Sequence, residues 1–194
     1  MAPHSAPRQF SSIPYVFLVA DLSGYARAFR HRPDEEIASF LDRYYGLAES
    51  VVSDAGGRII KFMGDSILAR FVPENAAQAV AATVALSTQV EELAAGAELP
   101  MSFGANLHLG PAVEAELGEG PSRRLDLVGR AVNQAFLLGR GPGIRISEAV
   151  YRKLPSGERT PWEKNRPPAV YVLAGGRPPY DGLGKTPNEN AARW

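Results

Sequence analysis

The spacing of apolar residues divides the first half of the chain into a strand, a helix and two further strands. Residues 14–20 form a short apolar run rich in β-formers, which predicts a buried strand. Proline and acids at 33–36 predict a helix start, and apolar positions then recur every three or four residues until the glycines at 56–57. Residues 58–63 and 66–71 read as strands joined by Gly64 and Asp65. A glycine in the first turn position suits a two-residue hairpin of type II′.

The second half predicts one more long helix, one strongly alternating strand and several short elements. In order, we expect a helix at 73–95, a half-buried strand at 101–110, a strand at 112–117 pairing beside it, a helix at 128–138, a strand at 144–146, a helix at 148–154 capped by Ser147, and a last strand at 169–173. The order β-α-β-β-α-β is that of a ferredoxin-like sheet. The sequence therefore predicts an α+β fold with additional C-terminal strands and short helices.

Length and composition favour one ordinary globular domain. Of the 194 residues, we assign 14–174 to the domain, 1–13 to a flexible N-terminal segment and 175–194 to a Gly/Pro-rich tail. Basic and acidic residues are equal in number, 21 each, which argues against a nucleic-acid or anionic-membrane partner. There is no cysteine, and no apolar run approaches the ~20 residues that span a bilayer. We expect a cytoplasmic protein.

Two aspartates stand where a metal site is plausible. Asp21 follows the first strand, and Asp65 lies at the tip of the hairpin. In a β-α-β-β fold the first strand lies beside that hairpin, so the two carboxylates are expected to converge. Paired carboxylates with backbone carbonyls are the ligands of Mg²⁺ bound to nucleotide phosphates. Aspartate is also common in turns for structural reasons alone, which is the competing interpretation.

Three separated motifs resemble those of class III nucleotidyl cyclase catalytic domains. They are residues 17–25 (FLVADLSGY), 57–71 (GRIIKFMGDSILARF) and 126–133 (DLVGRAVN), and they occur in that family's order. Segments 108–110 and 146–150 also lie where the family has similar ones. The resemblance covers roughly residues 15–173 and implies the palm-type cyclase fold and a nucleoside triphosphate substrate. Such enzymes work as homodimers, in which the ribose 3′-hydroxyl attacks the α-phosphorus and pyrophosphate leaves.

The resemblance also implies roles for individual residues. Two ions of Mg²⁺ or Mn²⁺ are expected in each site, one lowering the pKa of the hydroxyl and the other holding the triphosphate. The implied roles are metal binding by Asp21, Asp65 and the Leu22 carbonyl, phosphate binding by the amides of Ser23, Gly24 and Tyr25, base recognition by Lys61 and Asp126, and ribose orientation by Asn133. The aspartates come from one protomer, and Lys61, Asp126 and Asn133 come from the other.

The hydrogen-bonding capacity of Lys61 and Asp126 limits the base independently. Lysine only donates and an ionised aspartate only accepts, which suits the N1 acceptor and N6 amine of adenine. Guanine offers the opposite groups, whereas cytosine offers the same ones as adenine. The pair therefore allows ATP or CTP, and the resemblance favours ATP. A pyrimidine nucleotide cyclase making cyclic CMP or cyclic UMP is kept as an alternative, and so is the interpretation of both residues as ordinary surface charges.

One position departs from the family pattern. The arginine expected four residues after the asparagine, to neutralise charge developing on the phosphates, is Leu137 here. Loss of such a donor typically costs ~10²–10³ in rate. Arg140 lies one turn further along and is the candidate substitute, although Gly139 and Gly141 flank it. Under the resemblance, the expected alternatives are a weak cyclase, a cyclase with a different cation, and a degenerate domain that only binds nucleotide or dimerises.

Overall fold

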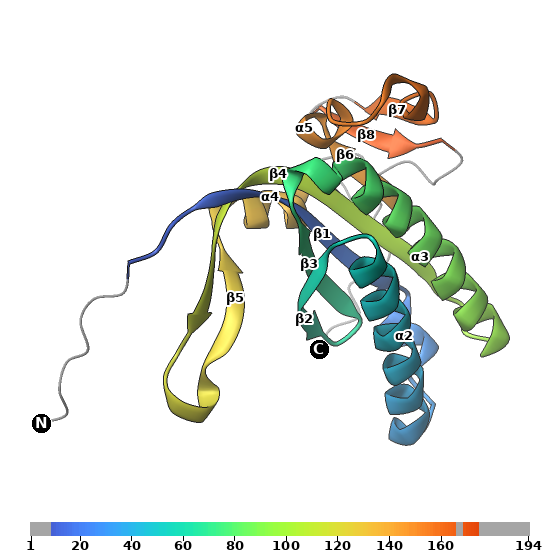
Figure 1. The fold of residues 1–194 in the computed structure, drawn as a ribbon. Helices are drawn as coiled ribbons and strands as arrows, with labels where there is room; N and C mark the ends of the chain where they lie inside the picture. Colours follow the sequence, from blue (N-terminus) through green and yellow to red (C-terminus); the bar gives the residue numbers. More distant parts are fainter. Residues whose placement is uncertain (1–8, 166–168, 175–194) are drawn as a thin grey trace, which may run out of the picture.

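The computed structural model describes residues 9–165 and 169–174. The expected tail at 175–194 lies outside the described residues, as does most of the expected N-terminal segment. The elements are, in order, β1 (Ile13–Ser23), α1 (Tyr25–Ala28), α2 (Asp34–Asp54), β2 (Arg58–Met63), β3 (Ser66–Phe71), η1 (Pro73–Asn75), α3 (Ala76–Gly96), β4 (Ser102–Leu117), η2 (Gly120–Ser122), β5 (Arg124–Val128), α4 (Arg130–Leu137), β6 (Gly143–Ser147), α5 (Glu148–Tyr151), η3 (Ser156–Glu158), β7 (Trp162–Asn165) and β8 (Val170–Leu173) (Figure 1).

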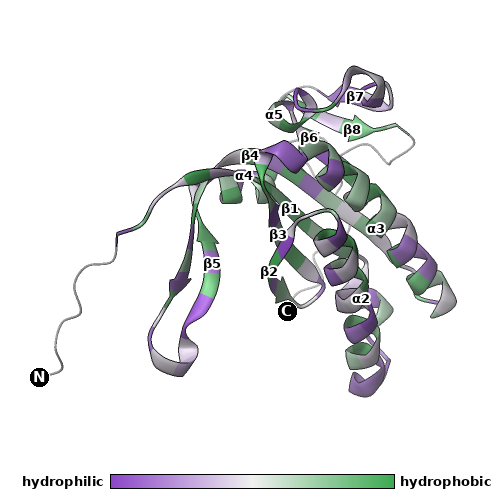
Figure 2. Ribbon diagram, viewed as in Figure 1, coloured by the Kyte–Doolittle hydropathy of each residue, from purple (hydrophilic) through white to green (hydrophobic). Residues whose placement is uncertain are grey.

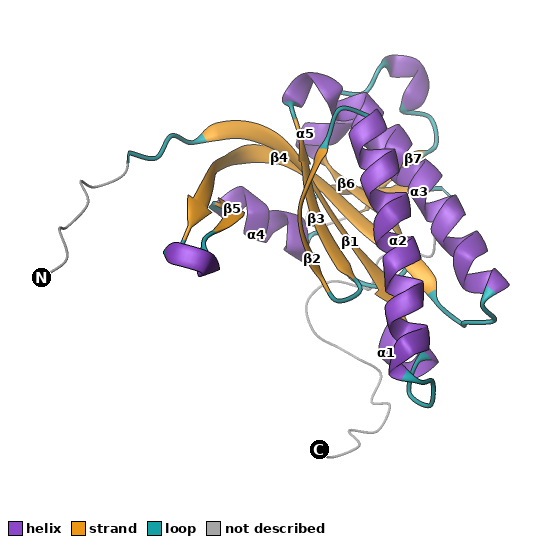
Figure 3. Cartoon of the chain, turned by 60° about the horizontal axis from the view of Figure 1, so that its bottom comes forward, coloured by secondary structure: helices purple, strands orange, loops and turns teal. Residues whose placement is uncertain are grey.

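A single mixed sheet forms the centre of the molecule. Its strand order is β2-β3-β1-β4-β6-β8-β7, with β5 paired to the far part of β4. The central strand β1 is antiparallel to both β3 and β4, whereas β4 and β6 run parallel. The long helices α2 and α3 cover one face of the sheet, and α4 lies on the other, beside the arm that β4 and β5 form (Figures 1 and 3). The predicted α+β fold is confirmed.

Alternation along β1 creates two cores on opposite faces. Val16, Leu18 and Ala20 belong to the large core under α2 and α3. The residues between them, such as Phe17 and Val19, pack with the smaller core that α4 covers. Since side chains alternate along a strand, Asp21 continues the second series and lies on the α4 side of the sheet. Along α2 hydrophobic and hydrophilic residues are interspersed, as in an amphipathic helix (Figure 2).

An irregularity in β2 changes which residues share a face. The pairing with β3 shifts register between Ile59 and Lys61, which leaves Ile60 as an extra residue. Ile59 packs against the core under α2 and α3, whereas Ile60 packs against the core under α4. Lys61 lies opposite Leu68, which also belongs to the α4 side. A β-bulge re-aims side chains in this way, and here it turns both Ile60 and Lys61 toward the α4 side.

Several expected boundaries were wrong. The first strand continues through Asp21 to Ser23, because Leu22 and Ser23 still pair with Phe103 and Ser102 of β4. The strands expected at 101–110 and 112–117 are one strand, β4, and the partner of its second half is β5. Part of β5 had been expected inside a helix at 128–138, which begins only at Arg130.

The short elements were also imperfectly predicted. The elements α1 and β7 were not expected, and α5 ends at Tyr151 instead of residue 154. The cap on α5 was predicted correctly, since the Val150 amide donates to the Ser147 hydroxyl at 3.5 Å. Within the described residues, no helix is both long and apolar enough to cross a bilayer.

A pair of glycine substitutions tests the packing of the sheet. A Cβ added at Gly57 would collide with the ring of buried Phe71, whereas a Cβ at Gly46, on α2, would meet open space. We expect Gly57→Ala to cost about 1–3 kcal/mol of stability through overpacking. Gly46→Ala should instead add roughly 0.5–1 kcal/mol, because alanine favours a helix. Thermal unfolding of the two variants should therefore shift in opposite directions, and equal shifts would contradict the packing described.

Candidate functional site

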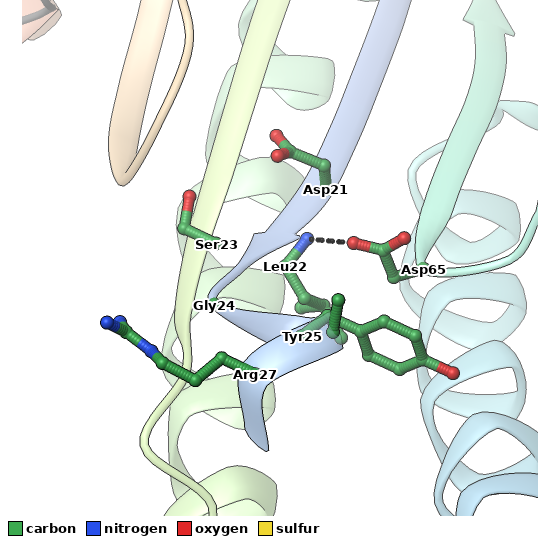
Figure 4. Close-up of a pocket in the computed structure, with 8 residues that line it drawn as sticks. Asp21, Leu22, Ser23, Gly24, Tyr25, Arg27 and Asp65 are labelled. Carbon is green, nitrogen blue, oxygen red and sulfur yellow. Dashed lines mark hydrogen bonds between the residues drawn. The ribbon is translucent and has the colours of Figure 1, made fainter. Parts of the chain in front are cut away.

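The two aspartates singled out in the sequence meet at the end of β1. Asp21 lies on β1, and Asp65 lies in the two-residue turn between β2 and β3. The Leu22 amide donates a hydrogen bond to Oδ2 of Asp65 at 3.3 Å, which ties the turn to the strand (Figure 4). Convergence of the carboxylates, expected from the order of elements, is therefore present in the structure.

An aromatic contact from α2 fixes the turn that carries Asp65. Tyr45 stacks on Phe62 with ring centroids 3.9 Å apart, and its hydroxyl donates to the Gly64 carbonyl at 2.6 Å. Gly64 has a φ of +64°, a conformation that glycine adopts without strain. The turn is thus held from both sides, by α2 and by β1.

The electrostatics of the carboxylates favour a bound cation. Burial raises the pKa of Asp21, the negative charge of Asp65 raises it further, and Arg145 opposes both effects. Repulsion between two ionised carboxylates in partly desolvated surroundings is relieved when a divalent cation binds between them. These residues therefore fit a Mg²⁺ or Mn²⁺ site. The described residues contain no group of three or more His, Cys, Asp or Glu side chains able to hold a metal, so backbone and substrate oxygens must complete the ligand set.

The orientation of Leu22 supplies one such oxygen. In an antiparallel strand the N–H and C=O of one residue point to the same side. The Leu22 amide is directed at Asp65, beyond the last β1–β3 pair, which joins Ala20 to Ile67. The Leu22 carbonyl is consequently directed to the side of β1 on which Asp65 lies, where it is available as a metal ligand.

An open pocket of about 490 Å³ surrounds these groups. It is lined by Asp21, Leu22, Ser23, Gly24, Tyr25, Ala26, Arg27 and Asp65 (Figure 4). Gly24 has a φ of +93° and turns the chain from β1 into α1. The three residues expected to bind phosphate therefore line the same pocket as the aspartates. Arg27 also lines it and was not singled out in the sequence, because nothing in the local pattern distinguishes it from other surface arginines.

The candidate base-recognising residues form a close ion pair. Nζ of Lys61 lies 2.8 Å from both carboxylate oxygens of Asp126. Asp126 is on β5, and its Oδ1 also accepts from the Leu127 amide at 2.8 Å. The bulge in β2 brings the lysine to this position, since it turns Lys61 toward the side on which β5 lies. The structure thus joins two residues that are 65 positions apart.

The residues expected on and after α4 are directed away from the sheet. Ala131, Val132 and Ala135 form the buried face of α4. Asn133 is exposed on the opposite face, together with Leu137, whose side chain is 73% exposed. Arg140 lies beyond the end of the helix, is exposed, and is not among the residues that line the pocket. Within this single chain, neither Asn133 nor Arg140 is therefore brought into the pocket that holds the aspartates.

A buried arginine, Arg145, was missed by the sequence analysis. It is 1% exposed, and its two terminal nitrogens donate to four backbone carbonyls at 2.8–3.1 Å, three in the loop after α4 and one at the first residue of β6. Asn106 donates to a fifth carbonyl, that of Gly139, at 2.9 Å. Arg145 thus holds the loop after α4 in place, and it also places a positive charge near Asp21. In the sequence it reads only as the polar residue between Ile144 and Ile146.

Comparisons with known proteins connect this arrangement to one group of enzymes. No family model matches the chain. It is 29% identical over 152 residues to an adenylate cyclase from Anabaena cylindrica, covering 71% of this chain and spanning only 30% of the length of that relative. The adenylyl cyclase CyaB from P. aeruginosa superimposes with a TM-score of 0.78 at 18% identity, covering 91% of this chain and 100% of CyaB. The guanylyl cyclase Cya2 superimposes with a TM-score of 0.71 at 23% identity, over 89% of this chain and 97% of Cya2.

Replacing Asp21 tests the metal site through stability. A carboxyl whose pKa is raised by folding destabilises the folded state once the pH exceeds its unfolded pKa. At pH 7 we therefore expect Asp21→Asn to raise the melting temperature of the metal-free protein by a few degrees. Mn²⁺ should raise the melting temperature of the wild type and leave that of Asp21→Asn unchanged. Asp42→Asn, at an exposed position on α2, should respond to Mn²⁺ like the wild type. An undiminished Mn²⁺ effect in Asp21→Asn would contradict the site.

Proposed function

We propose that the chain, which resembles class III nucleotidyl cyclase catalytic domains in its fold and in the order of its motifs, converts a nucleoside triphosphate to a cyclic 3′,5′-monophosphate and pyrophosphate. ATP is the proposed substrate. The observation that carries this proposal is the meeting of Asp21 and Asp65 in an open pocket at the end of β1. The similar proteins described above, which are named as adenylyl and guanylyl cyclases, support the same class of reaction.

Different residues of the pocket would bind the metal ions and the phosphates. Asp21, Asp65 and the Leu22 carbonyl would hold the two divalent ions. Bound there, Mg²⁺ or Mn²⁺ would acidify the ribose hydroxyl and offset charge on the phosphates. The amides of Ser23, Gly24 and Tyr25 would donate hydrogen bonds to phosphate oxygens from the turn that follows β1. The turn between β2 and β3 is already fixed by Tyr45, so little ordering accompanies binding.

The Lys61–Asp126 pair supports adenine as the base. Lys61 donates and Asp126 accepts, which matches the N1 and N6 groups of adenine and opposes those of guanine. The two residues are held together at 2.8 Å, so the base would insert against a preformed donor and acceptor. Cytosine presents the same pattern on a smaller ring, and a cyclase making cyclic CMP or cyclic UMP is the alternative within this class.

The placement of α4 supports a site shared between two copies of the chain. Asn133 is directed away from the sheet that carries its own Asp21, so a second chain is needed to bring an asparagine to each pocket. Apolar side chains are exposed on the same side, with Val128 52%, Phe136 38% and Leu137 73% exposed. Exposed apolar surface of this kind indicates an interface. We propose a symmetric homodimer in which Lys61, Asp126, Asn133 and Arg140 of one protomer serve the aspartates of the other.

A second function is favoured by one observation, the apolar residue at position 137. Leu137 is exposed on the face of α4 that Asn133 occupies, and it offers no charge to a phosphate. A chain with no cation at this point would bind nucleotide or dimerise without turnover. The two functions differ in whether the purified protein releases product.

Product analysis separates these possibilities. The purified chain is incubated with ATP, CTP, GTP or UTP and with Mg²⁺ or Mn²⁺, and cyclic nucleotide and pyrophosphate are measured. We expect cyclic AMP and an equal amount of pyrophosphate. Asp65→Asn should abolish both products without lowering the melting temperature, while Asp42→Asn should retain them. If the chain binds triphosphate but none of the four reactions yields product, the second function is favoured.

Exchange of the base-recognising charges tests the substrate. In the variant Lys61→Glu/Asp126→Cys an acceptor and a weak donor replace the original donor and acceptor. We expect kcat/KM for ATP to fall by about 10- to 100-fold, as for loss of hydrogen bonds to charged groups, while use of GTP rises. Lys153→Gln, at an exposed position remote from β5, lowers the net charge by the same one unit and controls for that change. An unchanged preference for ATP over GTP in the double variant would show that these residues do not read the base.

A further inference from the structure

With a triphosphate and two divalent ions bound, the pocket would carry an excess of negative charge. Two divalent ions offset a fully ionised triphosphate, and the carboxylates of Asp21 and Asp65 then leave the loaded pocket with net negative charge. Arg27 is the one basic residue among those that line the pocket. A cation in this position lowers the electrostatic cost of binding negatively charged phosphates in a partly desolvated site.

The side chain of Arg27 is placed over the turn that follows β1. Its Nη2 lies 3.8 Å from the position that a Cβ on Gly24 would occupy, so the guanidinium folds back against that glycine. Ser23 and Arg27 extend on one side of the turn, and Tyr25 and Asp65 lie on the other (Figure 4). A triphosphate held by the carboxylates and laid across the turn would therefore reach Arg27 at its far end.

The other cations near the site are already committed. The two terminal nitrogens of Arg145 are bound to backbone carbonyls, and the side chain is buried. Lys61 is paired with Asp126 at 2.8 Å. Arg27, by contrast, is exposed and has no ion-pair partner among residues 9–165 and 169–174. Its five N–H donors are free to bind phosphate oxygens.

We propose that Arg27 is the triphosphate-binding cation of this site, and that it serves the aspartates of its own chain. It would bind the oxygens of the terminal phosphates, which become the pyrophosphate leaving group, and so provide in cis a positive charge that Leu137 cannot provide. This inference rests on the proposed cyclase function, because it presumes a triphosphate in the pocket.

Binding of inorganic tripolyphosphate tests the assignment without requiring turnover. Calorimetry in the presence of Mn²⁺ should show that Arg27→Ala weakens binding of tripolyphosphate by about 10- to 100-fold, as expected for loss of charge-assisted hydrogen bonds. Arg27→Lys should recover part of the loss, since it restores charge but not the planar fork. Arg30→Ala removes the same charge from an exposed position three residues along, beyond the end of α1, and this variant should bind like the wild type. Equal weakening in Arg27→Ala and Arg30→Ala, or none in either, would overturn the proposal.

Mixing of inactive variants tests whether Arg27 acts within its own chain. If Asn133 serves the partner's site, a mixture of Asp65→Ala with Asn133→Ala should recover roughly a quarter of wild-type activity, because half of randomly paired dimers then carry one intact site of two. A mixture of Asp65→Ala with Arg27→Ala should recover none beyond the activity of Arg27→Ala alone, since each site keeps one defect. Recovery in this second mixture would place Arg27 in the partner's site and overturn the inference. Failure of the first mixture would instead count against the shared site of the proposed function, so the two failures are distinguishable.

Discussion

Partial burial of the Asp21 carboxylate beside a second carboxylate, that of Asp65, is the constraint around which the site is arranged. Burial, and after it the negative charge of Asp65, raises the pKa of Asp21, so the ionised form of Asp21 is disfavoured in the folded chain. Rigid packing maintains this arrangement. β1 is buried at the centre of the sheet, and the turn that carries Asp65 is held by the Leu22 amide and by Tyr45. The stability of the surrounding fold thus maintains a local arrangement that favours metal binding.

The loop after α4 approaches the Asp21 carboxylate closely, and this approach depends on Gly104 in β4. A Cβ at Gly104 would lie 2.5 Å from the Gly141 carbonyl and 3.0 Å from Oδ1 of Asp21. The loop after α4 therefore packs beside Asp21 because this position has no side chain. Arg145 holds that loop through its carbonyls, and its buried positive charge partly offsets the charge of Asp21. One arginine thus fixes the loop and moderates the electrostatics of the aspartates.

The cations of the site have separate tasks under the proposed function. The terminal nitrogens of Arg145 are bound to backbone carbonyls, Lys61 is paired with Asp126 for the base, and Arg27 remains exposed in the pocket for phosphate. The departure at Leu137 then has a physical consequence. Positive charge that the resemblance leads one to expect at position 137 would instead come from Arg27 of the chain whose aspartates bind the metal. Such a site would still depend on its dimer partner for Lys61, Asp126, Asn133 and Arg140.

The sequence alone determined the order of the central elements and the meeting of the two aspartates. Alternation in β1 and β4 and helical spacing in α2 are local patterns, and the β-α-β-β order brings the end of the first strand beside the hairpin turn. Asp21, Asp65 and the Ser147 cap could therefore be found from local signals. Only the tertiary structure decided that residues 102–117 form one strand with β5 as its partner, that a bulge turns Lys61 toward Asp126, and that Arg145 and Arg27 differ in availability. These features depend on strand pairing and burial between distant segments, and such contacts leave no periodic trace in the residues that make them.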